Sequence, residues 1–209
     1  MTTSGRSFRK CGPVFVLALA ASTAGAAGGE ATKSAPEEIL SDQLIASGNQ
    51  AVGTYSCFWR QGRGSEESYE VVCNYSFDGR ANGKGEFELF GQNGFGATLK
   101  RNGSVASLSS IEGQCEGAEE LNCDVVELDL EPSKAHVRTC QANQEKVFFH
   151  RFKRGKKSTS PTKTAAYLVR GDQVTVTGLQ DGDFIGAVYH GKAKSVVGWL
   201  KQSEIKCNL

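Results

Sequence analysis

Proline, methionine and histidine are scarce in this chain of 209 residues, and several common functional motifs are missing. With 25 glycines against 4 prolines, turns built on glycine should be frequent. The sequence contains no H-E-x-x-H, G-x-S-x-G or Walker segment and no C-x-x-C pair. Its three histidines, His136, His150 and His190, are not clustered. We therefore expect a protein that is not an enzyme and that holds neither a metal ion nor another cofactor.

Long apolar runs are also lacking, because the only one spans residues 13–21. Arg6, Arg9 and Lys10 precede this run, and Ala24-Gly25-Ala26 follows it. This order of charge, apolar core and small residues is typical of a secretory signal, and the run is too short for a permanent membrane helix. The pattern predicts that residues 1–26 are cleaved. The mature protein would then be periplasmic or secreted, without a transmembrane segment.

Cleavage would remove Cys11 and leave an even set of cysteines: Cys57, Cys73, Cys115, Cys123, Cys140 and Cys207. An even number in an exported chain indicates disulfide bonds, although several pairings are possible. Spacing favours Cys57 with Cys73, across two neighbouring strands, and Cys115 with Cys123, around a short acidic loop. Cys140 with Cys207 would then tie the last residues to the first domain.

Charge divides the chain into two parts. Residues 27–150 hold 10 basic and 19 acidic side chains, whereas residues 151–209 hold 11 basic and 4 acidic ones. Such a split indicates two modules. The acidic loop carries Glu116, Glu119 and Glu120, which could contact a basic protein. The basic run over 151–164 could meet an anionic lipid, lipopolysaccharide or wall polymer, or serve only as a hydrated linker.

Short runs rich in aromatic and β-branched residues predict an all-β fold. One helix is expected first, over 37–46, where Ile39, Leu40, Leu44 and Ile45 have helical spacing. Runs of strand character, separated by turn dipeptides such as Asn102-Gly103, then follow at 54–60, 69–77, 86–90, 96–101, 104–111, 125–130, 134–141 and 146–152. This succession predicts a disulfide-stapled antiparallel β-meander, closed as a barrel or stacked as a sandwich.

These patterns give a division of the chain into five parts. They are a signal peptide over 1–26, a flexible or short helical lead over 27–50, a disulfide-linked β domain over 51–154, a basic linker over 155–164, and a small five-stranded barrel over 165–209.

The carboxy-terminal part carries the most specific pattern. Gly171-x-x-Val174-x-Val176 is followed by a strand over 184–189 and by Gly198-Trp199-Leu200. Over about 165–207, these residues make the chain resemble the bacterial SH3-like domain family, with Phe184 where the family usually has Trp. The resemblance implies a partly open barrel that often binds cell-wall peptide or glycan, or mediates protein contacts.

Aromatic side chains suit such a groove, because they offer a broad apolar face and a polar tip. The candidates are Tyr167, Tyr189 and Trp199, although Trp199 also fits a place in a small core. We expect a non-catalytic envelope protein that binds peptidoglycan or an envelope protein, and not nucleic acid. The alternative is an inhibitor of a lysozyme-like enzyme, or a toxin-immunity protein, that acts through the acidic β domain.

Overall fold

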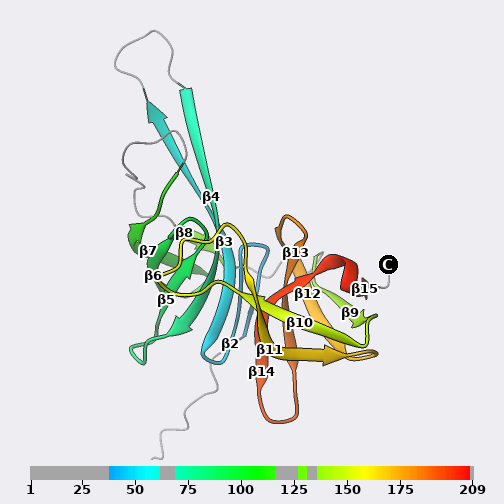
Figure 1. Ribbon diagram of the computed structural model, residues 1–209. Coiled ribbons are helices and arrows are strands. Elements are labelled where there is room, and N and C mark those ends of the chain that lie inside the picture. Colours follow the sequence, from blue (N-terminus) through cyan, green and yellow to red (C-terminus); the bar gives the residue numbers. More distant parts are fainter. Residues whose placement is uncertain (1–37, 62–68, 116–126, 131–135, 208–209) are drawn as a thin grey trace, which may run out of the picture. The chain divides into compact units, whose positions relative to one another are not determined.

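Strands build almost all of the described chain. The computed structural model describes residues 38–61, 69–115, 127–130 and 136–207. These strands form two antiparallel sheets (Figure 1), so the predicted all-β, antiparallel fold class is confirmed. The predicted signal peptide over 1–26 lies outside the described residues. Within the described ranges, no helix has the length and hydrophobicity that a membrane crossing requires.

The first sheet is a meander in which the strand order follows the chain, as predicted. Its strands are β1 (Ile39–Leu40), β2 (Leu44–Ser47), β3 (Gln50–Gln61), β4 (Tyr69–Ala81), β5 (Glu86–Gly91), β6 (Gly96–Asn102), β7 (Val105–Glu112) and β8 (Glu127–Asp129). The expected hairpin is present as β3 and β4, paired from Gln50 with Arg80 to Gln61 with Tyr69. Gly103, with a φ of 67°, makes the predicted turn between β6 and β7.

This sheet curls around a core of its own. Alternate residues of its strands, among them Tyr55, Tyr75 and Phe77, point into one buried cluster. Ile39 of β1 and Leu128 of β8 belong to the same cluster, although they come from opposite ends of the strand order. A flat sheet could not bring its two edges to one core, so the sheet must be strongly curved.

The helix expected over 37–46 is wrong, because β1 and β2 occupy this segment. Leu44, Ile45 and Ala46 are consecutive and all buried. Leu44 and Ala46 face the core of the first sheet, whereas Ile45 points to the opposite side. A strand buried on both faces shows no alternation of apolar and polar residues, so its pattern is easily taken for that of a helix.

The second sheet begins earlier in the chain than the sequence indicated. Its strands, from one edge to the other, are β11 (Thr162–Val169), β10 (Lys146–Arg151), β14 (Ser195–Lys201), β13 (Phe184–His190), β12 (Gln173–Asp181), β9 (Arg138–Ala142) and β15 (Ile205–Cys207), with the 3-10 turn η1 (Gln202–Glu204) before β15. Strands β9 and β10 were expected in the first domain, yet they pair with β12, β15, β11 and β14. The sheet therefore starts at Arg138.

The segment expected to be a linker, 155–164, packs on the first sheet and then enters the second. The Ser158 carbonyl accepts a hydrogen bond from the Asn93 amide at 3.0 Å, and the Gln92 side chain donates to the Thr159 carbonyl at 3.1 Å. Strand β11 begins at Thr162. These contacts hold the segment against the first sheet, so it connects the two sheets along a defined path.

The two sheets meet at a third apolar cluster, which we call the junction. Its members are Ile45, Val52, Phe90, Phe152, Leu179, Val188, Val197 and Trp199. The backbones approach closely here, because a Cβ on Gly186 would lie 2.4 Å from Leu179 Cδ2 and 3.1 Å from Ile45 Cδ1. The junction therefore buries the outer side of β2 and β3 against β13 and β14.

Disulfide stapling is confirmed, but its connectivity differs from the expectation. Cys140 bonds to Cys207, as predicted, and joins β9 to β15 within the second sheet. Cys73 bonds to Cys115, so the pairs Cys57–Cys73 and Cys115–Cys123 are wrong. Cys57 lies opposite Cys73 in the β3–β4 ladder and is itself disulfide-bonded. Cys123 lies outside the described residues.

Candidate functional site

An aromatic pair, the half-buried Phe148 and the exposed Tyr167, lies on the side of β10 and β11 that faces away from the core of the second sheet. The ladder places Phe148 opposite Tyr167, and their ring centroids are 5.6 Å apart at an interplanar angle of 50°. Tyr167 is 47% exposed and Val169 is 48% exposed. Among the described residues, these are the only large apolar side chains with that degree of exposure. Soluble proteins rarely gather such side chains without a use for them, so this surface is the first candidate for binding.

Two lysines complete this surface. The Lys163 Nζ lies 3.4 Å from the centroid of the Phe148 ring, and the Lys146 Nζ lies 5.3 Å from that of Tyr167. Both distances are typical of cation–π contacts, which hold the ammonium groups beside the rings. We call Lys146, Phe148, Lys163, Tyr167 and Val169 the aromatic face.

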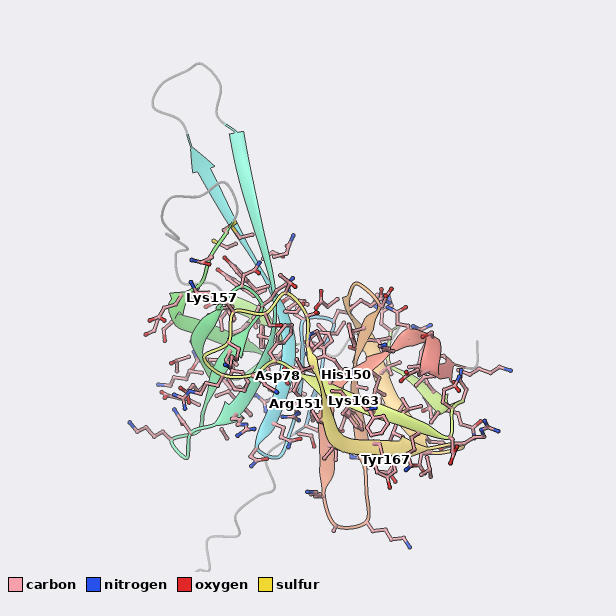
Figure 2. The ribbon with its side chains drawn as sticks, in the orientation of Figure 1. Asp78, His150, Arg151, Lys157, Lys163 and Tyr167 are labelled. Atoms are coloured by element: carbon pink, nitrogen blue, oxygen red, sulfur yellow. A yellow bond between two sulfur atoms is a disulfide. The ribbon has the colours of Figure 1, made fainter. Side chains whose placement is uncertain are left out.

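The strand period explains why these residues share one side. Along β11, Lys163, Tyr167 and Val169 are exposed, whereas Leu168 is fully buried in the core of the second sheet. Figure 2 shows Arg151, Lys163 and Tyr167 following one another along the β10–β11 pair. Strand β11 also ends the strand order, so the aromatic face borders a sheet edge.

A local irregularity separates the aromatic pair from the start of β11. The β10–β11 register shifts between Phe148 and His150. Here the Thr164 hydroxyl donates to the Phe149 carbonyl at 2.9 Å and accepts from the Ala166 amide at 3.2 Å. The hydroxyl thus replaces ladder hydrogen bonds that the bulge interrupts, and it fixes the course of β11 beside the rings.

The three aromatic residues that sequence reasoning selected do not come together. Trp199 is fully buried in the junction, with the first sheet against it. Tyr189 is half-buried and packs against the core of the second sheet. Leu168, the neighbour of Tyr167, points into the same core. Tyr167 alone is widely exposed, on the side away from that core. The glutamates Glu116, Glu119 and Glu120 lie outside the described residues, so the inhibitor alternative stays a prediction.

Sequence reasoning missed Phe148, Lys146 and Lys163. Each lies in a run that was recognised as a strand or a linker, and nothing in one strand shows which residue of another lies opposite it. One signal could have pointed to them. Residues 163, 167 and 169 face outward on the same strand, so a partner strand with an outward-facing aromatic residue could have been sought beside it.

Beside the aromatic face, a buried polar network joins β10 to the first sheet (Figure 2). Asp78 is fully buried, and its Oδ2 accepts a hydrogen bond from the Phe152 amide at 2.5 Å. The Arg151 Nε lies 3.9 Å from Asp78 Oδ1. The Arg151 guanidinium also donates to Gln50 Oε1 at 2.7 Å and to the Val197 carbonyl. The network fixes the end of β10, and with it the strand that carries Phe148.

Burial controls the ionisation of this network. Loss of hydration raises the pKa of the Asp78 carboxyl to about 7, although the Phe152 amide and the Arg151 guanidinium favour the charged form. Near neutral pH, Asp78 is therefore a mixture of the acid and the carboxylate.

Among the described residues, no three His, Cys, Asp or Glu side chains gather as a metal site would need.

Comparison of the chain with family models, curated proteins and solved structures found no match.

Proposed function

We propose that this chain is an exported, non-catalytic binding protein of the cell envelope and that its aromatic face holds peptidoglycan. One observation carries the proposal: the most exposed large apolar side chains of the described residues lie side by side with an aromatic ring and two lysines. Rings stack on the apolar faces of sugars, and ammonium groups pair with the carboxylates of peptide stems. Peptidoglycan presents both groups at short spacing.

The SH3-like resemblance supports this proposal through the position of its motifs. Val174 and Val176 lie in β12, residues 184–189 lie in β13, and Gly198-Trp199-Leu200 lies in β14. These strands all belong to the second sheet, in which β14 pairs with β10 and β10 with β11, while Gly171 lies in the turn before β12. We extend the proposal to an SH3-like second module that includes β9 and β10.

Export is part of the same proposal. The Cys73–Cys115 and Cys140–Cys207 bonds suit an oxidising compartment such as the periplasm or the cell exterior. Such a place would bring the aromatic face to wall material. The apolar run over 13–21 supplies the expected route of export.

Co-sedimentation of the oxidised mature protein with purified peptidoglycan at moderate salt tests the proposal. The whole chain after the predicted cleavage site is needed, because a fragment starting at residue 155 would lack β9 and β10. Wild-type protein should sediment with the polymer, and Tyr167→Ala should weaken binding roughly tenfold or more. Failure of the wild type to sediment, or equal binding by Tyr167→Ala, would contradict the proposal.

A charge-matched pair sharpens this experiment. Lys146→Gln removes one cation from the aromatic face, and Lys192→Gln removes one from the exposed β13–β14 turn. We expect a several-fold loss of binding for the first and none for the second, because direct pairing depends on position more than on net charge. Equal losses would show that only overall charge matters.

A further inference from the structure

A second surface, which borders the aromatic face and shares Lys163 with it, is a pocket of about 350 Å³. Its lining comes from β4, β5, β10, β11 and the loop after β10, and consists of Arg80, Glu88, Phe90, Arg151, Phe152, Lys153, Arg154, Thr162, Lys163 and Thr164. We call it the cationic pocket, because five of these side chains are basic and one is acidic. Its volume lies near the lower end of the roughly 300–1,000 Å³ that small-molecule sites span.

Three of the five cations already have partners. Arg154 pairs with Glu88, Arg151 is held by Gln50 and lies near Asp78, and Lys163 rests on the Phe148 ring. These contacts give the pocket a defined shape. The aromatic floor, Phe90 and Phe152, belongs to the junction and is 9% and 3% exposed, so it is rigidly packed.

The remaining two cations are available to a ligand. Arg80 and Lys153 are exposed, and neither lies within ion-pair distance of an acidic group among the described residues, although the charge of Arg80 also acts on the buried Asp78 carboxyl. Arg80 comes from β4 of the first sheet, and Lys153 from the loop after β10. Like charges from two separate elements line one pocket, where an anion between them would relieve their repulsion.

The charge and size of the pocket select the ligand class. A single carboxylate brings one negative charge, whereas a phosphate ester brings up to two, spread over three strong acceptor oxygens. The Arg80 guanidinium offers paired donors that match phosphate geometry, and Lys153 adds a mobile ammonium. Thr162 adds a hydroxyl and Phe90 an apolar edge to the lining, and a sugar ring offers partners for both kinds of group.

We propose that the cationic pocket binds a phosphorylated sugar, with Arg80 and Lys153 as the residues that hold the phosphate. The two residues that hold the phosphate lie outside the aromatic face, although Lys163 belongs to both surfaces, so this binding does not require a peptidoglycan ligand. It also gives a use to the basic run over 151–164, which supplies Lys153, Arg154 and Lys163.

Isothermal titration calorimetry of the full mature protein with glucose 6-phosphate tests the proposal at low salt. The variant Arg80→Gln/Lys153→Gln removes both available cations, and Lys192→Gln/Lys194→Gln removes two exposed cations from the β13–β14 turn. All four side chains are exposed, so both variants should fold, which circular dichroism will check. We expect saturable binding that weakens roughly tenfold or more in the first variant and stays within about twofold in the second.

Two comparison ligands define the specificity. Unphosphorylated glucose should not bind, and glucuronate, which carries a carboxylate on the same ring, should bind more weakly than glucose 6-phosphate. Absence of saturable binding up to millimolar glucose 6-phosphate, equal weakening in both double variants, or tighter binding of glucuronate would overturn the proposal. Peptidoglycan co-sedimentation by the Arg80→Gln/Lys153→Gln variant should remain intact, which separates a failure here from a failure of the aromatic face.

Discussion

The junction and the aromatic face combine the same kinds of side chain, aromatic rings and cations, in opposite surroundings. In the junction, Trp199 is fully buried, and Arg151 beside it shares hydrogen bonds with Gln50 and the Val197 carbonyl. On the aromatic face, Tyr167 is 47% exposed, and its lysine neighbours touch rings but no carboxylate among the described residues. Both regions use β10, and they differ in whether the first sheet covers them.

This difference teaches how to separate a structural aromatic residue from one that is available to a ligand. Residue type alone does not decide it, because both Trp199 and Tyr167 are candidates from the sequence, although Trp199 is the one that also fits a small core. Both side chains lie on the side of the second sheet that faces away from its own core, and the first sheet covers only the part of that side that carries Trp199. A planar guanidinium can satisfy several acceptors at once, so arginine suits the covered region, whereas hydrated ammonium groups suit the open one.

The largest expected contrast is in folding stability. Trp199→Ala should lower the free energy of unfolding by about 3–5 kcal/mol, because it opens a cavity in the packed junction. Tyr167→Ala should lower it by less than about 1 kcal/mol, because the side chain is half exposed. Urea unfolding followed by circular dichroism measures both values. Similar losses for the two variants would show that the aromatic face is a part of the core.

A second contrast appears when the pH is changed. Because the folded-state pKa of Asp78 is raised to about 7, the folded protein holds the proton between about pH 4 and 7 and the unfolded chain does not. The contribution of protonated Asp78 to the stability of the folded state is therefore complete below about pH 4 and is lost as the pH rises through 7. The difference between this pKa and the ordinary value of an aspartate carboxyl corresponds to roughly 4 kcal/mol at most.

Asp78→Asn isolates this effect, because the amide oxygen can still accept the Phe152 hydrogen bond. We expect the unfolding free energy of the wild type, minus that of Asp78→Asn, to fall by up to about 4 kcal/mol between pH 4 and 8. Urea titrations at several pH values measure it. A difference that stays constant with pH would mean that Asp78 does not titrate in this range. Asp181, whose pKa burial also raises, titrates in both proteins and cancels.

The sequence was a good guide where local pattern decides structure. The β3–β4 hairpin followed from aromatic and β-branched runs, and the turn at Asn102-Gly103 followed from its dipeptide. The bond between Cys140 and Cys207 was also expected, although for another reason: it was thought to join two domains, and it closes the second sheet. Local chemistry determines the hairpin and the turn, so one sequence contains them, whereas the bond between cysteines 67 positions apart follows from elimination of the other pairs.

The sequence was a poor guide where segments that are distant in the chain meet. The core on one side of β2 and the junction on the other made the helix prediction wrong. The places of β9 and β10 in the second sheet depend on pairing with strands up to 67 residues later, which no local pattern encodes. The same holds for the aromatic face and the cationic pocket, since the partner of Tyr167 is set by register and Arg80 comes from the other sheet.

The smallest expected contrast compares the two kinds of cation. Arg151→Lys should lower the free energy of unfolding by about 1–3 kcal/mol, because a lysine cannot donate to Gln50 and to the Val197 carbonyl in the same way, although Gln50 keeps its hydrogen bond from the Val197 amide. Lys163→Arg, on the open side, should change it by no more than about 0.5 kcal/mol, because a guanidinium can also lie over the Phe148 ring. Urea unfolding at pH 8, where Asp78 is largely charged, measures both. If Arg151→Lys were as mild as Lys163→Arg, the network around Asp78 would add little to the apolar contacts of the junction, and the covered and open regions would differ in their aromatic residues alone.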